Sequence, residues 1–546
     1  MRDLLLIALF LMVSLVPLAL AAPSPDTYYV APWGDDNNPG TRDSPWKSLG
    51  LATRRMKPGD TLIILEGKYV LSEYDTDIIM PPSGREDAWT IIRGEGSRRP
   101  VLAGKDNLLT AIDISRRSYI RIENLEITSD DGAQFRDGIE ALGGPVSHVV
   151  LKDLYIHHID EMGIDMADVE DLKVINCSIT YCGFGSIGGP KGEHGGWRNV
   201  LIQDCYLAYA GHYYQGGPGS SPYDRPDGFG IEPSLGPIEI ARTIVEHNRG
   251  DGLDSKADNT YIHECVVANN FADGVKLWGP GSRLENTLIY GRGDGSTQVT
   301  PWSPIVVASQ RPGKFEIIGV TMDDEIGGNY IMHVQYDYDV PIELTVKNTI
   351  FSGRGPSSPI FVRKGVKFKF DGCLFYFPRS GFVLTVGEEQ YGPEDVPKLG
   401  NNFYGDPMFV RTGFGGNGDY HLRKGSPAIN NGVRASLKTD LDGCPRPQGG
   451  GFDIGAYEFG SCSRRLNEGH PQEEAATLSN TKTSPPELTE TRVSGGTVTV
   501  VKEVERDERL IEYLLSLIAV LLVIMVVALA LGTFKRVDRE SSQSMR

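Results

Sequence analysis

The sequence predicts an all-β fold of the solenoid class, and three observations lead to that prediction. Asp-Gly pairs recur at Asp227, Asp251 and Asp273, so the period is 24 residues and then 22. Short β-branched runs, TIVEHN and CVVANN, fill the intervals and leave no room for a helix. The chain also contains 65 glycines, which suits a fold made of many tight turns. Short strands and Asn/Gly/Asp turns that repeat about every 20 to 25 residues are typical of a β-solenoid.

The repeat arranges ionisable residues in columns, because matching positions of successive coils stack about 4.8 Å apart. The first column contains Asp227, Asp251 and Asp273. The columns three and five residues further on contain Gly230, Asp254 and Lys276, and then Glu232, Lys256 and Trp278. We expect these side chains to form one cluster on one face of the solenoid. That cluster is the candidate functional site.

The solenoid is expected to occupy residues 26–400, followed by a closing cap at 401–462. A strand at 28–31 precedes an amphipathic helix that begins at Ser44-Pro45 and ends near Met56, since proline is favoured at the first helical position. This helix is expected to cover the first coil, which a solenoid would otherwise expose.

Two longer segments, 186–199 and 212–226, interrupt the period before the acidic repeat. We expect both to interrupt the same corner and to rise beside the Asp column as the walls of a cleft, because long loops on a rigid scaffold often carry binding groups. The residues expected to contact a ligand there are Trp197, His212 and Tyr213, together with Trp278. Plain packing of these side chains, and a loop that contacts nothing, remain the alternatives.

The N-terminal residues have the pattern of an export signal, and the C-terminal residues have the pattern of a membrane anchor. Residues 1–22 have the charged start, apolar run and small-residue cleavage pattern of a signal peptide. Residues 463–509 are polar and poor in aromatics, as in a disordered stalk. Residues 511–534 are apolar enough to form one transmembrane helix, and the basic tail 535–546 is then cytoplasmic. The expected location is the cell membrane, with a single span and an extracellular body.

The net charge limits the classes of binding partner, and the positions of the cysteines predict which are core residues and which form a disulfide. The net charge of −18 argues against nucleic acid as a partner, and an anionic substrate would need a bridging cation or a local basic cluster. Four of the seven cysteines lie in strand phrases and are expected to be core residues: Cys177, Cys205, Cys265 and Cys373. Cys444 and Cys462 flank a terminal segment and are a candidate disulfide pair, while Cys182 stays unassigned. We expect a monomer.

Several motifs together resemble a known group. The opening, YYVAPWGDDNNPGT…SPWKSL…KPGDTLIILEGKY, resembles that of secreted right-handed parallel β-helix proteins, including family 9 polysaccharide (pectate) lyases. The segment GDPMF…DYHLRKGSPAINNG…FDIGAYE is similar to the end of surface β-helix proteins that carry varied anchors. The resemblance covers about residues 26–460. It implies a right-handed, single-stranded parallel β-helix that is located at the cell surface and acts on polysaccharide.

The resemblance also implies an activity, a Ca²⁺-dependent β-elimination of acidic, uronate-containing polysaccharide. In family 9 lyases an Asp-Gly-Phe coil and an Asp-Asp-Gly-x-Asp coil supply calcium ligands, and a lysine in a Gly-Phe-Lys-Leu-Gly context is the base. Asp227, Asp251 and Asp254 match the ligands, with Asp273 as a marginal fourth, and Lys276 matches the base. Gly250 stands where the family has another Asp.

Alternatives remain open at this stage. Lys256 is a competing base, and Lys276 with Asp254 could simply be a surface ion pair. The Asp-Gly pairs also have a purely conformational role in turns. A glycoside hydrolase on the same fold would use two carboxylates, such as Asp251 with Asp273 or Glu232, and a non-catalytic glycan-binding or adhesion protein would use none. A second cluster, His157-His158 with Asp160 and Asp165, is a weaker candidate, since adjacent strand residues point to opposite faces.

Overall fold

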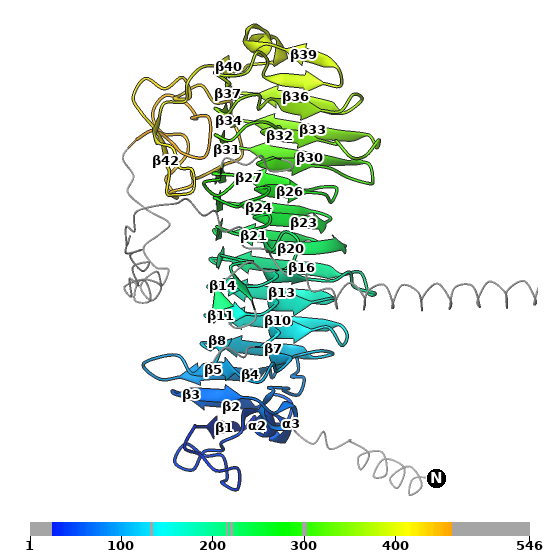
Figure 1. The fold of residues 1–546 in the computed structure, drawn as a ribbon, viewed down its shortest axis with the longest axis vertical. Helices are drawn as coiled ribbons and strands as arrows, with labels where there is room; N and C mark the ends of the chain where they lie inside the picture. Colours follow the sequence, from blue (N-terminus) through cyan, green and yellow to red (C-terminus); the bar gives the residue numbers. More distant parts are fainter. Residues whose placement is uncertain (1–24, 131–134, 215–216, 219–221, 297–302, 461–546) are drawn as a thin grey trace, which may run out of the picture. The chain divides into compact units, whose positions relative to one another are not determined.

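A computed structural model describes residues 25–130, 135–214, 217–218, 222–296 and 303–460 of the chain. Three long sheets of parallel strands run along one stack of coils (Figure 1), and from β4 onward a typical coil contributes one strand to each sheet. The predicted parallel β-helix is therefore confirmed.

Sheet 1 contains thirteen strands in chain order: β1 (Thr27–Val30), β2 (Thr61–Leu65), β4 (Thr90–Glu95), β7 (Ser118–Glu123), β10 (Val146–Lys152), β13 (Val169–Ile175), β16 (Trp197–Gln203), β21 (Ile238–Ala241), β24 (Thr260–His263), β27 (Arg283–Glu285), β30 (Gly313–Ile318), β33 (Ile342–Lys347) and β36 (Lys367–Asp371).

Sheet 2 also contains thirteen: β3 (Lys68–Leu71), β5 (Val101–Gly104), β8 (Glu126–Ser129), β11 (Tyr155–Ile159), β14 (Ser178–Cys182), β17 (Tyr206–Ala208), β22 (Ile244–Glu246), β25 (Val266–Ala268), β28 (Leu288–Tyr290), β31 (Thr321–Asp324), β34 (Ile350–Gly353), β37 (Leu374–Tyr376) and β40 (Phe403–Tyr404).

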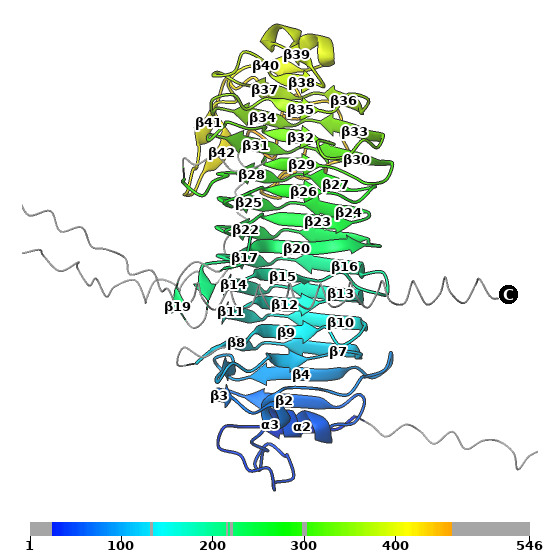
Figure 2. The same cartoon turned by 45° about the vertical axis from the view of Figure 1, so that its right-hand side comes forward.

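Sheet 3, which Figure 2 shows along the middle of the stack, contains twelve: β6 (Thr110–Asp113), β9 (Asp137–Ala141), β12 (Met162–Met166), β15 (Gly185–Gly189), β20 (Asp227–Ser234), β23 (Leu253–Ala257), β26 (Val275–Leu277), β29 (Ile305–Val307), β32 (Met332–Val334), β35 (Ile360–Val362), β38 (Leu384–Val386) and β39 (Glu389–Tyr391). The last of these, β39, pairs with β38 in the antiparallel sense. Two antiparallel hairpins lie outside the sheets: β18 (Tyr213–Tyr214) with β19 (Gly217–Pro218), and β41 (Phe409–Arg411) with β42 (Asp419–Leu422).

The interior is filled by stacks of apolar side chains, and each stack takes one side chain from successive coils. In sheet 2 the register aligns Ile156, Ile179, Leu207, Val245, Val267 and Ile289, and all six are buried. At the neighbouring corner the buried Asn248 and Asn270 form a ladder, in which Asn248 Nδ2 donates to Asn270 Oδ1 at 2.9 Å. Apolar stacking and the amide ladder together hold successive coils in one register.

Both ends of the stack are covered. Helix α2 (Leu49–Arg55) buries Leu49 and Ala52 against the first coils, which confirms that a helix covers this end. It begins at Leu49 and not at Ser44-Pro45 as predicted, because the Trp46 amide donates to the Tyr29 carbonyl at 2.9 Å and so pairs with β1. A shorter helix, α3 (Tyr74–Asp77), follows. At the other end, the 3₁₀ helix η1 (Pro393–Leu399) contributes Val396 to the main core.

The segment expected to close the solenoid, 401–462, differs from that expectation. Its described part packs on the outer face of sheet 2, where Phe409, Tyr420 and Leu422 join Leu288 and Leu374 in a second apolar cluster. The apolar outward side chains of sheet 2 explain this placement, because they would otherwise be exposed to water. The segment lies beside β31–β37 (Figure 1).

The cysteine predictions are confirmed for the core residues. Cys177, Cys205, Cys265 and Cys373 are buried free thiols, as predicted, and so is Cys182. Cys444 is disulfide-bonded, and its predicted partner, Cys462, lies outside the described residues.

The remaining predictions about the ends also fall outside the described residues. These are the signal peptide 1–22, the stalk 463–509, the membrane helix 511–534 and the tail 535–546, and they stay predictions. In the part of the chain that the structure describes, no helix is long and apolar enough to cross a membrane.

Candidate functional site

The predicted column on sheet 3 is confirmed by the strand register. Gly230 of β20 pairs with Asp254 of β23, and Asp254 pairs with Lys276 of β26. The column continues to Val306 and then His333 in the next two strands. Because these strands are neighbours, the side chains of Asp254 and Lys276 project side by side from one sheet.

The three Asp-Gly aspartates form a ladder at the start of these strands. The Asp251 amide donates to Asp227 Oδ1 at 2.7 Å, and the Asp273 amide donates to Asp251 Oδ1 at 2.9 Å. The Ser303 amide then donates to Asp273 Oδ1 at 2.7 Å. Each aspartate therefore uses one oxygen to hold the next coil, so the conformational role is real. The second oxygen of each is left for the site.

Lys276 lies inside a cage of carboxylates. Its Nζ lies 2.5 Å from Asp251 Oδ2, 3.2 Å from Asp273 Oδ2 and 3.9 Å from Asp254 Oδ2. Its side chain is 3% exposed, so this is a buried cluster and not the surface pair considered above. Burial acts to lower the pKa of Lys276, but the three carboxylates outweigh burial and raise that pKa above its ordinary value.

Lys256 lies on the solvent side of the same cluster. Its Nζ lies 3.2 Å from Asp254 Oδ2 and 3.3 Å from Glu232 Oε1, and its side chain is 28% exposed. Burial would lower the pKa of Lys256, but Asp254 and Glu232 raise it. Asp254 thus lies between two amines, of which Lys256 is the more accessible.

Three of the four predicted metal ligands are grouped so that one cation could contact them. One carboxylate oxygen each from Asp227, Asp251 and Asp254 lies within 4.8 Å of the others. Asp254 Oδ1 is buried without a hydrogen-bond partner in the described structure, which is a costly arrangement unless a ligand uses the oxygen. Hard oxygen donors of this kind suit Ca²⁺. Asp273 is not in the group; its Oδ2 faces Lys276 instead.

Burial perturbs the acids of this site. It raises the pKa of Asp227 well above its usual range, and the nearby Asp251 and Asp254 carboxylates add to the effect. Burial also raises the pKa of Asp273 to about 7, with a further contribution from Asp251. Carboxylates that repel one another in this way gain from a bound cation.

Gly250, the position where the family pattern has another aspartate, is tightly enclosed. A Cβ atom placed there would lie 2.3 Å from Asp227 Oδ1 and 2.5 Å from the carbonyl carbon and oxygen of Arg225. Real Cβ atoms essentially never approach other atoms this closely. The end of the second insertion, at Arg225, therefore occupies the space that a side chain at 250 would need.

Two of the predicted ligand-contacting residues are wrong. Trp197 is 1% exposed, and its indole Nε1 donates to the Met166 carbonyl at 2.8 Å, so it is a core residue at the start of β16. Tyr213 is 6% exposed and packs its ring edge-on against His158. Neither ring is open to a ligand.

The other two predicted contacts are half-buried. Trp278, directly after β26, packs edge-on against Tyr338 at 5.8 Å between ring centroids. His212 packs edge-on against Tyr209 at 5.8 Å. Trp278 is therefore beside the Lys276 strand, whereas His212 belongs to the corner between sheets 2 and 3.

The two insertions do not interrupt the same corner. Strands β15 and β16 take up half of 186–199, so only residues 190–196 connect sheet 3 to sheet 1. The second insertion, 212–226, connects β17 of sheet 2 to β20 of sheet 3, directly before Asp227. Only the second one can form a wall beside the aspartate ladder.

The histidine pair His157-His158 also differs from expectation. The two Nδ1 atoms lie 2.6 Å apart, although adjacent strand residues were expected to point to opposite faces. The reason is that His158 has a φ of 57°, so the backbone turns there and brings the rings together. Burial lowers the pKa of His158 to about 4, and its ring stacks on Tyr181, which indicates a structural role.

Sequence reasoning missed an aromatic group further along the same sheet. Tyr330, Tyr336 and Phe361 contact one another with ring centroids 5.1–6.3 Å apart, and Tyr336 is 52% exposed. Phe361 pairs with His333, so it continues the column that contains Lys276. Extending that column by register beyond the Asp-Gly repeat is the signal that would have found it.

Fold and site together define a parallel β-helix protein with a buried acid–lysine cluster on one sheet. Residues 28–277 match the family described as Pel9A-like, right handed beta helix region. This region of the chain is therefore similar to family 9 pectate lyase-like β-helix proteins, in line with the resemblance seen in the sequence.

Individual proteins that match this chain share about a quarter of their residues with it over the aligned regions. Pectate lyase PEL9 of Emericella nidulans is 24% identical over 296 residues, which are 53% of this chain and 62% of the relative. Lacto-N-biosidase of Bifidobacterium longum is 27% identical over 201 residues, 26% of this chain and 12% of the relative. The chain thus spans less than two thirds of either protein. The crystal structure of pectate lyase Pel9A aligns with a TM-score of 0.43 and 14% identity, covering 80% of this chain and 97% of that one.

Proposed function

We propose that this protein is a polysaccharide lyase that cleaves uronate-containing polysaccharide by β-elimination, with Lys276 as the base and Ca²⁺ held by Asp227, Asp251 and Asp254. The observation that carries the proposal is the juxtaposition in one column of a lysine amine and an oxygen cluster that fits a cation. The match of residues 28–277 to the Pel9A-like family and the similarity to pectate lyase PEL9 support the same activity.

The chemistry requires a base beside a carboxylate-binding centre. The proton removed in β-elimination, at C5 of a uronate, is only weakly acidic while the adjacent carboxylate is charged. When bound, Ca²⁺ would neutralise that carboxylate and acidify the proton. The chain itself would hold the sugar at the column and present a lysine amine to C5. That amine must be neutral to act as a base, whereas the three carboxylates raise the pKa of Lys276. A cation on Asp251 and Asp254 would offset their charge and lower that pKa.

The cage around Lys276 fixes the position of that amine. Contacts from Asp251 and Asp273 hold Nζ on two sides, so the amine has one defined location relative to Asp254. Such positioning is what a general base needs, because a displacement of about 1 Å can cost about 100-fold in rate. Lys256 reaches Asp254 from the solvent side and is the alternative base.

The test uses the full chain with polygalacturonate and Ca²⁺, and measures both the ultraviolet absorbance of an unsaturated product and the release of reducing ends. Lys276→Met is expected to lower turnover by about 10²- to 10⁴-fold. Because this variant leaves buried carboxylates without their partner, Lys276→Arg is measured beside it; arginine keeps the charge but cannot act as the base. Lys369→Met, at an exposed lysine of sheet 1, is the matched control.

Each outcome decides something. Loss of turnover in both Lys276 variants, with folding retained in Lys276→Arg, supports the proposal. Retained turnover in Lys276→Arg together with loss in Lys256→Met would move the base to Lys256. Reducing ends without ultraviolet absorbance would show hydrolysis instead of elimination, and binding without either signal would show a non-catalytic protein.

A further inference from the structure

A second binding region lies beside the aspartate ladder. A pocket of about 420 Å³ opens at the corner between sheets 2 and 3, where the second insertion rejoins the coils. It is lined by Tyr223, Asp224, Arg225, Pro226, Arg249, Phe271 and Ala272. The site described above uses other residues.

The lining residues are stacked one coil apart. The Gly250 amide donates to the Pro226 carbonyl at 2.8 Å, and the Ala272 amide donates to the Gly250 carbonyl at 3.0 Å. The residues directly before these positions are Arg225, Arg249 and Phe271, which therefore form a column of their own. Two guanidinium groups and one phenyl ring are presented in succession, about 4.8 Å apart at the backbone.

This column runs parallel to the aspartate ladder and two residues before it. Arg225 and Arg249 precede Asp227 and Asp251, whose carboxylates belong to the candidate cation group. A molecule seated in the pocket is consequently a near neighbour of that group.

The chemistry of the lining is specific. Guanidinium groups bind carboxylates through paired, charge-assisted hydrogen bonds. The acid in the lining, Asp224, has a side chain that is 91% exposed and lies 3.8 Å from Arg225 Nε. The charged residues of the lining are thus two arginines and one aspartate, in a chain with a net charge of −18.

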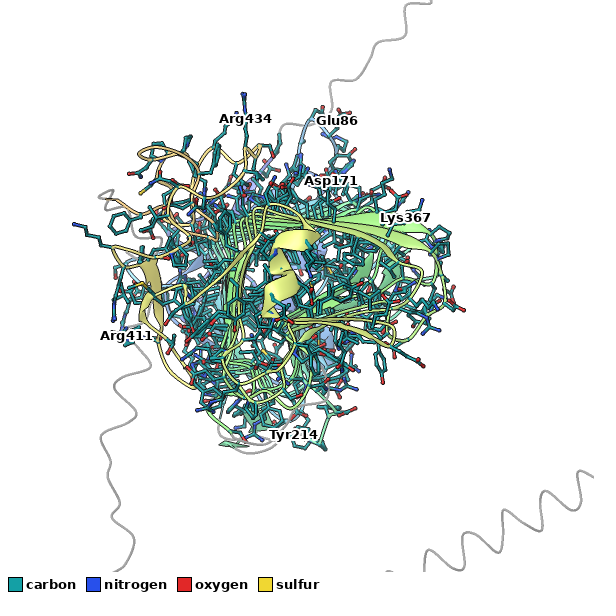
Figure 3. All side chains as sticks on the ribbon, turned by 90° about the horizontal axis from the view of Figure 1, so that it is seen from above. Glu86, Asp171, Tyr214, Lys367, Arg411 and Arg434 are labelled. Atoms are coloured by element: carbon teal, nitrogen blue, oxygen red, sulfur yellow. The ribbon has the colours of Figure 1, made fainter. Side chains whose placement is uncertain are left out.

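Aromatic rings complete the pocket. Phe271 is 36% exposed. Tyr223 is held in place, since its hydroxyl donates to Glu161 Oε1 at 2.8 Å and its ring packs at 4.7 Å from Phe184. Tyr214 of the β18–β19 hairpin packs edge-on against the ring of Tyr223. It projects from the periphery of the coils (Figure 3). Rings of this kind present flat apolar faces on which a pyranose can lie.

We propose that this pocket is a subsite for a carboxylate-bearing sugar residue of the polysaccharide, held by Arg225 and Arg249 and flanked by the rings of Tyr223 and Phe271. The identity of the polymer rests on the proposed function. The subsite makes acidic sugars preferred over neutral ones independently of Ca²⁺, because the arginines are part of the chain.

The experiment measures binding, so that it is separate from catalysis. A galacturonate hexamer and its carboxyl-reduced, neutral counterpart are titrated calorimetrically into the full chain, once with Ca²⁺ and once with EDTA. Arg249→Gln is expected to weaken binding of the acidic hexamer about tenfold in both conditions, with no effect on the neutral one. Arg249→Lys, which keeps the charge and loses the fork, should be intermediate. Arg198→Gln, at an exposed arginine of sheet 1, is the control.

The outcomes separate this proposal from the proposed function. If Arg249→Gln binds the acidic hexamer as tightly as the parent while circular dichroism shows an unchanged fold, the subsite is wrong even if the lyase is active. Equal affinity of the parent for the acidic and neutral hexamers in EDTA would also overturn it. If the arginine dependence is found but no unsaturated product forms with any polymer, the subsite stands and the lyase assignment fails.

Discussion

Gly250 offers the sharpest test of how the cation group is built. A Cβ atom there would overlap Asp227 Oδ1 and the backbone of Arg225, so Gly250→Ala must displace one of them. Forcing extra atoms into a packed site costs about 1–3 kcal/mol. Moving Asp227 would also break its hydrogen bond from the Asp251 amide, and a buried donor left unpaired costs about 1–3 kcal/mol. Stability should therefore fall by about 2 kcal/mol or more.

The same displacement should weaken cation binding, although no ligand is removed. Asp227 is one of the three grouped carboxylates, and losing the support of a ligand costs about 10- to 100-fold in metal affinity. Gly250→Asp, which restores the residue type of the family pattern, should behave like Gly250→Ala, because the added carboxylate has no space. Urea unfolding and calorimetric Ca²⁺ titration of the full chain measure the two effects.

Gly381 is the matched control. Among the described residues, no heavy atom beyond its own chain neighbours lies within 4 Å of the position that a Cβ would take there. Gly381→Ala and Gly381→Asp should therefore change neither stability nor Ca²⁺ affinity by much. If Gly250→Asp bound Ca²⁺ more tightly than the parent at unchanged stability, the steric reasoning would be refuted. Gly250 would then simply be a position at which this chain lacks one of the family's metal ligands.

Two further predictions concern residues away from the cation group. Trp197→Ala should lower the free energy of unfolding by about 3–5 kcal/mol and leave oligogalacturonate affinity unchanged in the folded protein; weaker binding at unchanged stability would restore Trp197 as a cleft residue. Asp165 pairs with Glu140 on sheet 3, and burial raises the pKa of Asp165 to about 7. Since the unfolded carboxyl titrates near pH 4, stability should fall as pH rises from about 4 to 7, by at most about 1.4 kcal/mol per pH unit. Asp165→Asn should reduce that slope in urea unfolding between pH 4 and 8, and an unchanged slope would contradict the reasoning.

The parts of the site that follow from strand spacing could be predicted from the sequence. The pairing of Asp254 with Lys276 is such a case, because the Asp-Gly period alone sets which residues are neighbours in adjacent coils. Which residues lie in a loop at a corner and which begin the next strand could not be predicted in the same way. Trp197 seemed to belong to a loop because a Gly-rich run precedes it, yet it begins a strand and fills the core.

The burial of the site residues also could not be predicted from the repeat pattern of the sequence. Whether Lys276 is a surface or a buried lysine depends on how Asp251 and Asp273 close around it, and these contacts involve side chains from neighbouring coils. The pocket at Arg225 and Arg249 depends on where the second insertion rejoins the helix, which a single sequence does not specify. Period and register are local in a solenoid, whereas enclosure involves several coils at once.

The charge balance of the cluster is a physical argument for the proposed divalent cation. Four carboxylates, those of Asp227, Asp251, Asp254 and Asp273, face two amines, those of Lys276 and Lys256. If all six are ionised, they carry a net charge of −2, which is unfavourable in a buried region unless it is compensated. The more exposed Glu232, which also contacts Lys256, adds a further negative charge on the solvent side. Protonation is one answer, and the raised pKa values of Asp227, Asp254 and Asp273 reflect it. A bound dication is the other, and it would compensate the two charges while leaving the carboxylates ionised. If Ca²⁺ binds as proposed, it would therefore compete with protons for these acids, and Ca²⁺ affinity should fall as the pH falls through their raised pKa values.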